Sequence, residues 1–338
     1  MFFLIGVVVA GCGSSVEDRG VESQRTNPSF AEPSKPQATQ GGRRRAHAAA
    51  GYLDRLKELV DTTEVRGLQK LLATDGARGD GFGESISVAG RVLVIGSIGR
   101  HLSPGAAYIF ERGSDGQWNQ RQKLTQDDGA AHDEFGLSVS VSGDVVVVGA
   151  HWDDDKGKSS GSAYVFERDS SGRWRQQQKL TASNGTAHDS FGFSVSVSGD
   201  VAVIGAHHDD TNRGENSGSA YVFVRDPNGR WSQRRKLMAA DGAKGDLFGN
   251  SVSVSGDVAV VGARWDDDKG KNSGSAYVFV RGSDGRWSQR QQLTPTDGAG
   301  GDNLGFSVSV SSDVIVVGAP SDDDKGDASG SAYVLSVP

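Results

Sequence analysis

The stretch FGLSVSVSGDVVVVGA, residues 135–150, decides the fold class of this chain. Ser138–Val141 alternates small polar and apolar residues, which is the period of a strand with two different faces. Ser142-Gly143-Asp144 has the composition of a tight turn. Val145–Val148 is a continuous apolar run, as expected of a strand that is buried on both faces. The stretch therefore predicts two antiparallel strands joined by a short turn.

Two further strands follow in the same unit. After a polar loop, Ala163–Phe166 forms a third apolar run, and Ser171-Gly172 makes another turn. Trp174–Leu180 then predicts the fourth strand. Later units carry Asn228-Gly229 and Asp284-Gly285 at the same turn, and such pairs favour turns with positive φ. Each unit therefore predicts a four-stranded antiparallel sheet.

The unit occurs five times in register. Phe-Gly or Leu-Gly pairs recur at spacings of 53, 56, 57 and 56 residues, starting at Phe82, Phe135, Phe191, Phe248 and Leu304. The same register carries Gly149-Ala150, Gly205-Ala206, Gly262-Ala263 and Gly318-Ala319, and a tryptophan at Trp118, Trp174, Trp231 and Trp287. Four-stranded units at this period are typical of propeller blades. We predict an all-β fold, a β-propeller of five four-stranded blades, with the recurrent tryptophans packed between blades.

An N-terminal strand is expected to close the ring. The fifth unit stops after three strands, whereas Val65–Leu71 precedes the first unit and ends Gln69-Lys70-Leu71, like Gln122-Lys123-Leu124. Such a strand would complete the fifth blade and remove a free sheet edge. The alternative is an open arc, or part of a larger ring made by two chains.

These residues resemble the FG-GAP repeat family, whose best-known members are the propellers of integrin alpha subunits. The resemblance covers about residues 65–338, and Gly318-Ala319-Pro320 matches the full motif, whereas the earlier units lack the proline. It implies a β-propeller used for binding, mostly outside the cytoplasm. The cation loops of integrins lie between the FG and GAP elements, where this chain has only a short turn, so that site does not carry over.

The N-terminal part predicts a lipid anchor and a tether. Residues 1–12 resemble a lipoprotein-type signal peptide that ends at Cys12, the site of lipidation, although no Lys or Arg precedes the apolar run. Residues 13–50 predict a disordered tether, residues 51–62 a short helix, and residues 63–338 the propeller. The expected location is the bacterial cell envelope, lipid-anchored at the outer membrane or cell surface. A frayed apolar terminus with an incidental cysteine is the alternative.

The candidate ligand-binding residues lie in the loops between the second and third strands. In an up-and-down blade these loops and the inter-blade loops share one face, and here both are long and acidic. We expect a protein or glycan to bind there, through an exposed tryptophan and its polar neighbours. The residues are His151, Trp152, Asp153, His207, His208, Arg264, Trp265 and Asp266.

The same loops contain the candidate metal ligands. No cofactor is required, but Ca²⁺ binds carboxylate and carbonyl oxygens, which these loops could supply. The competing interpretation, which we favour, is that the carboxylates cap turns and solvate the surface. The candidate ligands are Asp153, Asp155, Asp266, Asp268, Asp322 and Asp324.

Composition and symmetry exclude several functions. The formal charge of −7 argues against nucleic acid as a partner, and the single cysteine excludes a disulfide framework. Nearly all aspartates recur in the repeats, whereas the two members of a catalytic pair need different environments. We therefore expect a binding module that is not an enzyme, is a monomer, and contacts the membrane only through its lipid. A glycosidase or lyase on the same scaffold is the alternative.

Overall fold

The structure, a computed structural model, describes residues 8–9, 68–99 and 103–336, and the regular elements in these ranges are all β-strands. The predicted tether, the helix at 51–62 and Cys12 lie outside the described residues, as does the signal peptide apart from Val8–Val9. Those two residues form β1, which pairs in parallel with the first strand of blade 1.

Four complete blades and a three-stranded fifth blade make up the fold. Blade 1 contains β2 (Phe82–Ala89), β3 (Val92–Ser97), β4 (Ala106–Arg112) and β5 (Trp118–Leu124). Blade 2 contains β6 (Ser138–Ser142), β7 (Val145–Ala150), β8 (Ser162–Arg168) and β9 (Trp174–Leu180). Blade 3 contains β10 (Ser194–Ser198), β11 (Val201–Ala206), β12 (Ser219–Arg225) and β13 (Trp231–Leu237). Blade 4 contains β14 (Phe248–Ser255), β15 (Val258–Ala263), β16 (Ser275–Arg281) and β17 (Trp287–Leu293). Blade 5 contains β18 (Ser307–Val310), β19 (Val314–Ala319) and β20 (Ser331–Ser336).

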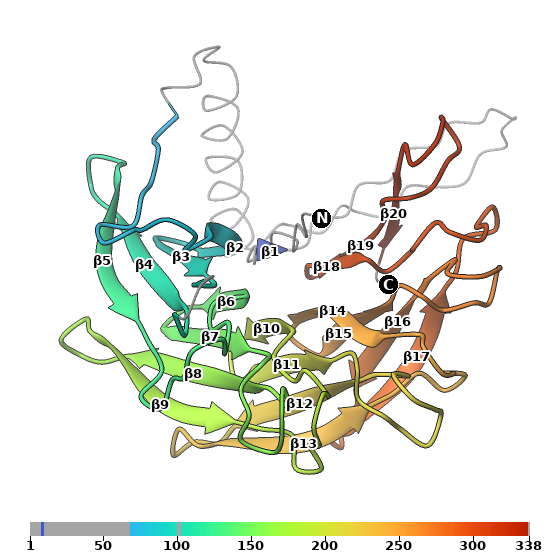
Figure 1. The fold of residues 1–338 in the computed structure, drawn as a ribbon, viewed down its shortest axis with the longest axis horizontal. Coiled ribbons are helices and arrows are strands. Elements are labelled where there is room, and N and C mark those ends of the chain that lie inside the picture. The colour runs from blue at the N-terminus through green and yellow to red at the C-terminus, as the bar shows by residue number, and fades with distance from the viewer. Residues whose placement is uncertain (1–7, 10–67, 100–102, 337–338) are drawn as a thin grey trace, which may run out of the picture. The chain divides into compact units, whose positions relative to one another are not determined.

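The predicted hairpins form in the expected register. Ser142 pairs with Val145 across the turn, and every residue of β7 is buried, as its continuous apolar sequence requires. Figure 1 shows the blades following one another around an arc from β2 to β20. The prediction of an all-β, five-bladed propeller is confirmed.

The predicted closing strand is not seen among the described residues. Blade 5 has three strands, and residues 68–71 are in no strand. Leu71 and Ala73 pack against the hydrophobic cluster of blade 1, where the end of a fourth strand of the preceding blade would lie. Val65–Gly67 lie outside the described residues. Closure by Val65–Leu71 therefore stays a prediction.

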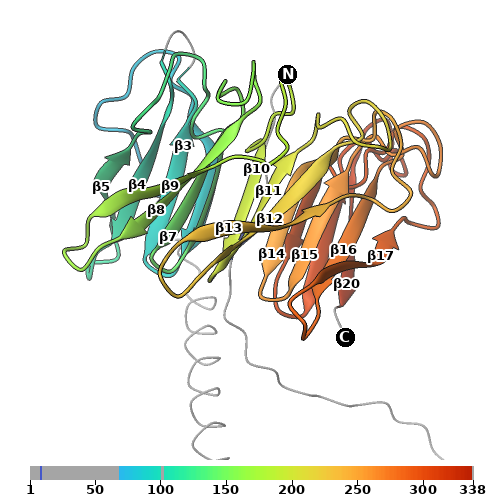
Figure 2. The same cartoon turned by 90° about the horizontal axis from the view of Figure 1, so that it is seen from below.

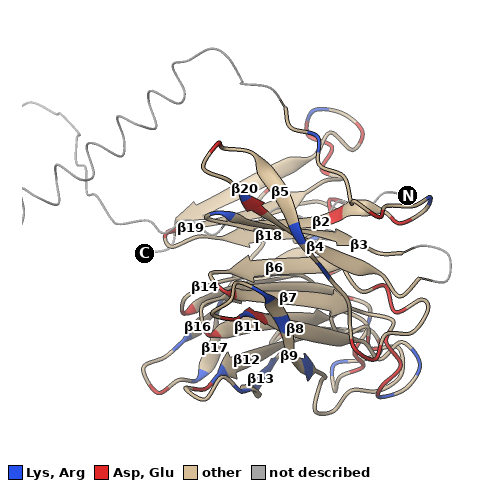
Figure 3. Ribbon diagram, turned by 90° about the vertical axis from the view of Figure 1, so that its left-hand side faces the viewer, with Lys and Arg blue, Asp and Glu red and all other residues tan. Residues whose placement is uncertain are grey.

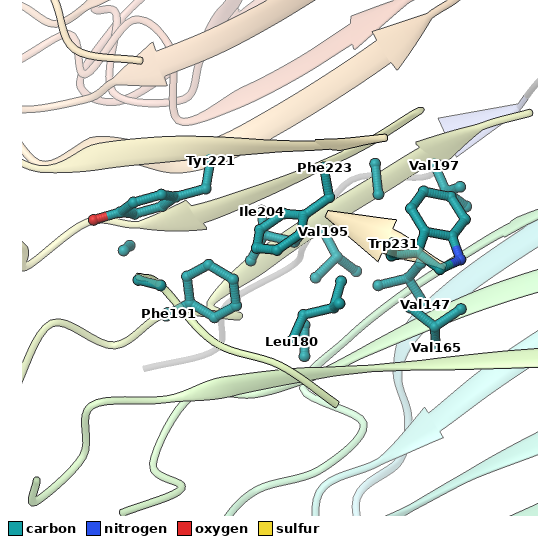
Figure 4. Packing of buried hydrophobic residues seen from close by; sticks show 14 of the residues in the cluster. Val147, Val165, Leu180, Phe191, Val195, Val197, Ile204, Tyr221, Phe223 and Trp231 are labelled. Atoms are coloured by element: carbon teal, nitrogen blue, oxygen red, sulfur yellow. The ribbon is translucent and has the colours of Figure 1, made fainter. Parts of the chain in front are cut away.

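Neighbouring blades are held together by apolar clusters. Figure 4 shows the cluster between blades 2 and 3, where Val147, Val165 and Leu180 meet Phe191 and Trp231. Equivalent clusters join blades 1 and 2, blades 3 and 4, and blades 4 and 5. Trp174, Trp231 and Trp287 are each at most 3% exposed and belong to the clusters between blades, as predicted. Trp118 differs, because it is only partly buried and packs on the cluster of its own blade 1.

The Phe-Gly and Gly-Ala pairs meet across each of these contacts. A Cβ on Gly149 would lie 2.0 Å from the carbonyl oxygen of Gly192 in the next blade, so no larger residue fits there. The hydroxyl of Ser138 donates a hydrogen bond to the same carbonyl at 2.8 Å. Gly192 itself has a φ of 91°, which favours glycine. We call this arrangement the blade clamp, and it explains why small residues recur at these positions.

Candidate functional site

The long loops lie along one edge of the blades. Figure 2 shows them along the upper edge, whereas the short turns that follow β6 and β10 lie at the opposite edge. Figure 3 shows Asp and Glu in these loops, to the right of β3 and β7. All eight predicted ligand-binding residues follow the second strand of blades 2, 3 or 4, at this edge. We call it the loop-rich face.

The first aspartate of each loop is buried and holds the loop in place. The carboxylate of Asp153 accepts hydrogen bonds from the Tyr164 hydroxyl at 2.8 Å, the Ser162 hydroxyl at 3.0 Å and the Asp155 backbone N–H at 3.1 Å. Asp266 accepts the corresponding bonds from Tyr277 and the Asp268 backbone. Both aspartates are 3% exposed. Of the predicted ligand-binding residues, Asp153 and Asp266 therefore shape the loops and do not face solvent.

A lysine ammonium lies among the candidate metal ligands of blade 2. Lys179 Nζ lies 2.7 Å from Asp128, 2.8 Å from Asp153 and 2.6 Å from Asp155. Burial alone would lower the pKa of Lys179, but its hydrogen bonds to these carboxylates raise it above the ordinary value. A Ca²⁺ ion held by Asp153 and Asp155 would have to displace this ammonium.

The other candidate metal ligands are less closely grouped. Among the described residues, Asp128, Asp153 and Asp155 are the one set of three such groups with ligand atoms within 4.8 Å of one another. In blade 4 a neutral side chain replaces the lysine, since Gln292 donates to Asp268 at 2.5 Å. In blade 5 the Asp322 carboxylate accepts from Tyr333 and from the Asp324 backbone. These contacts are those of carboxylates that cap turns, and Ca²⁺ binding is left as a proposal.

Three histidine rings, those of His151, His207 and His208, form one group of neighbouring rings with a phenylalanine. The ring centroid of Phe193 lies 5.6 Å from that of His151 and 3.9 Å from that of His207, and the His207 and His208 rings lie 3.9 Å apart at a tilt of 39°. Burial lowers the pKa of His151 to about 3 and that of His207 well below its usual range. We call these four residues the histidine cluster. At neutral pH its buried imidazoles are uncharged, so they pack as aromatic rings.

Arg264 occupies the matching position in blade 4. Its guanidinium lies 5.2 Å from the Trp265 ring and 5.7 Å from the Phe306 ring, which is cation–π distance. Burial lowers its pKa. Arg264 therefore makes cation–π contacts with the aromatic rings of both Trp265 and Phe306.

Two residues of this face were not predicted from the sequence. Phe193 and Phe306 each follow a Phe-Gly or Leu-Gly pair, and each contacts the residue that follows Gly-Ala in the preceding blade, His151 and Arg264 respectively. The signal was present, because the position after this pair varies between units as strongly as the loops do. The residues at this position are Glu84, Leu137, Phe193, Asn250 and Phe306.

Trp152 lies beside a groove in the loop-rich face. Trp152 is 44% exposed, and Trp265 is exposed to a similar extent, 43%. The groove has a volume of about 470 Å³. Its lining combines the indole with acidic, small and basic residues, namely Asp128, Ala130, Ala131, His132, Asp133, Trp152, Asp153, Asp154, Asp155, Lys158 and Ser159. We call it the Trp152 groove.

The recurrent aspartate of the inter-blade loops has a structural role. Asp133 Oδ2 accepts from the Ala130 backbone N–H at 2.8 Å, and Asp246 accepts from Ala243 in the same way. Burial raises the pKa of Asp246 to about 6. A raised carboxyl pKa is typical of glycosidase acids, but this group is used inside its own loop.

The sequence matches the FG-GAP repeat family over residues 66–110, 118–166, 174–223, 231–279 and 287–335. Each match after the first begins at the fourth strand of one blade and continues through three strands of the next. The first match begins at residue 66, so it includes most of the predicted closing strand. A comparison with curated proteins finds no match.

Proposed function

The chain belongs to the FG-GAP repeat family, and from this premise we propose that it is a non-catalytic binding module that recognises a protein or a glycan on its loop-rich face. The family scaffold is a β-propeller that typically serves binding, and the five blades of this chain fit that use. The observation that carries the proposal is the exposed indole of Trp152 beside the Trp152 groove.

The chemistry of the groove suits a ligand with both apolar and hydroxyl or amide groups. An exposed indole offers a flat surface for a sugar ring or an apolar side chain. Asp154, which bonds only the Ser159 backbone among the contacts described, and the half-exposed Asp155 have further lone pairs that accept hydrogen bonds. Binding sites commonly combine such an aromatic surface with a few polar groups.

We further propose that the module is held at the bacterial cell envelope by a lipid on Cys12. The support is the sequence alone, because the apolar run before Cys12 and the polar tether after it fit a lipoprotein. In the part of the chain that the structure describes, no helix has the length and hydropathy to cross a membrane.

A broad glycan and peptide array tests the binding proposal. Labelled wild-type protein should bind a limited set of spots, and Trp152→Ala should lose most of that signal. Asn228→Ala, in an exposed turn away from the loop-rich face, is the matched control and should bind like wild type. Equal binding by Trp152→Ala would contradict the proposed site. Release of reducing sugar from a bound glycan would instead support the glycosidase alternative.

A further inference from the structure

The two ends of the arc carry the unmatched halves of the contact that joins neighbouring blades. The blade clamp forms four times. A Cβ on Gly96, Gly149, Gly205 or Gly262 would in each case lie 2.0 Å from a carbonyl oxygen of the next blade. At the equivalent Gly318 of blade 5, the atoms within reach of a Cβ all belong to Ser307 of the same blade. Blade 5 therefore has the glycine and serine of a blade clamp, but no carbonyl from another blade lies against them among the described residues.

Blade 1 carries the complementary half. In blades 2 and 3 the glycine of the Phe-Gly pair lies against the preceding blade, since a Cβ on Gly136 would meet Ala106 O at 2.3 Å and one on Gly192 would meet Ser162 O at 2.2 Å. At Gly83 of blade 1, nothing described lies within 4 Å of such a Cβ.

The short bridges between blades show the same gap. A glycine just before the third strand of one blade forms a parallel β-bridge with the first residue of the Phe-Gly or Leu-Gly pair of the next blade. Gly161 pairs with Phe191 in this way, and Gly274 pairs with Leu304. The four bridges start at Gly105, Gly161, Gly218 and Gly274. Gly330 of blade 5 has the same position, and Phe82 is its unmatched counterpart among the described residues.

The apolar faces are equally incomplete. Val165 is fully buried against blade 3, whereas Val334, at the same position in blade 5, is 69% exposed. Val195 is 6% exposed against blade 2, whereas its equivalent in blade 1, Ile86, is 38% exposed. Leu71 and Ala73 already take the places on blade 1 that Leu180 and Ala182 take on blade 3.

We propose, in contrast to the monomer expected from the sequence, that blade 5 of one copy of this chain docks on blade 1 of a second copy, forming the blade contact a fifth time. The occupant is a second copy because Figure 1 shows the two end blades apart within one chain. Bringing them together would require four close-packed clusters to shift, and packed interiors resist such changes. The contact joins two different surfaces, so it is head-to-tail and extends from copy to copy unless a ring closes.

Charge placed in this contact should separate the copies without unfolding them. Val334→Glu and Ile86→Glu change exposed side chains, and Asn228→Glu adds the same charge at an exposed turn outside the contact. With full-length Cys12→Ser protein, light scattering should give a mass that rises with concentration. Either charged variant should give a monomer with an unchanged melting temperature, whereas Asn228→Glu should assemble normally. Wild-type protein that stays monomeric at all concentrations, or variants that assemble like it, would overturn the proposal.

Cross-linking then identifies which blades meet. In the Cys12→Ser background, chains carrying Ile86→Cys are mixed with chains carrying Val334→Cys and treated with a short bismaleimide. The proposal predicts a covalent dimer in this mixture, and none when Asn228→Cys replaces Val334→Cys. If a link forms only when both cysteines are in one chain, the ring closes on itself and the proposal is wrong.

Discussion

Two classes of tryptophan have opposite roles in this chain, and their positions in the repeat separate them. Trp174 is 3% exposed between blades, whereas Trp152 is 44% exposed beside the groove. The distinction was predictable from the sequence, because a tryptophan recurs at the position of Trp174 in four units, whereas Trp152 is the second residue after a Gly-Ala pair, a position that varies between units.

Trp174→Ala should lower the free energy of unfolding by roughly 3–5 kcal/mol, since it removes a large buried ring and leaves a cavity. Trp152→Ala should lower it by less than about 1 kcal/mol, because nearly half of the side chain already faces solvent. Chemical unfolding followed by circular dichroism measures both. Similar losses for the two variants would show that Trp152 is a packing residue.

His151 should make the protein less stable in mild acid. The folded protein keeps this imidazole neutral down to a pKa of about 3, whereas the unfolded chain binds a proton near 6.5. Stability due to this group is therefore present above pH 6.5 and is lost as the pH falls from there towards 3. Between pH 7 and pH 5, the free energy of unfolding of wild type should fall by about 2 kcal/mol more than that of His151→Phe. Parallel pH profiles for the two proteins would contradict the burial of a neutral imidazole.

At the scale of strands and loops, the sequence predicts the regular parts well and the loop contacts poorly. Alternation and turn residues place the strands, as Ser138–Val141 and Val145–Val148 show. In the sequence, Asp153 is a candidate ligand, although capping of a turn is the favoured interpretation of such carboxylates. Its partners Tyr164 and Lys179 lie on later strands, and their approach depends on the hydrogen-bonded register of the sheet. Loop chemistry of this kind is set by tertiary contacts that no local pattern encodes.

The blade clamp gives a matched pair of glycine substitutions. Gly149→Ala places a Cβ 2.0 Å from the Gly192 carbonyl, which is backbone and can move only if blades 2 and 3 separate. Gly318→Ala places a Cβ close only to the Ser307 hydroxyl, at 2.5 Å, which can rotate away, since the Ser307 backbone oxygen lies at an ordinary contact distance of 3.9 Å. In thermal melts of dilute protein, Gly149→Ala should lower the melting temperature much more than Gly318→Ala. Equal losses would show that the glycine is needed within its own strand and not between blades.

At the scale of the whole molecule, five repeated sheets present one loop-rich face, and the N-terminal segment is proposed to tie it to a membrane. Repeats at a fixed spacing were sufficient to predict five blades. They did not reveal that the end blades lie apart, because the sequence of each unit predicts the strands of one blade and not the angle between neighbouring blades.

Cys12 should carry the lipid that anchors the protein. Cells labelled with a fatty-acid probe should incorporate it into wild-type protein, and Cys12→Ser should stay unlabelled and fractionate away from membranes. The change removes the acceptor thiol and leaves residues 68–336 untouched. Two forms that are equally unlabelled and soluble would exclude the anchor.

Fluorine NMR of protein labelled with 5-fluorotryptophan tests the central claim, that the loop-rich face binds the ligand. The chain has six tryptophans, so single Trp→Phe variants can assign each resonance. Titration with the strongest array ligand should shift the resonance of Trp152, with Trp265 as the second reporter on the same face. The resonances of the buried Trp174, Trp231 and Trp287 should not shift. Saturation that leaves Trp152 and Trp265 unchanged would place the binding site elsewhere and contradict the account.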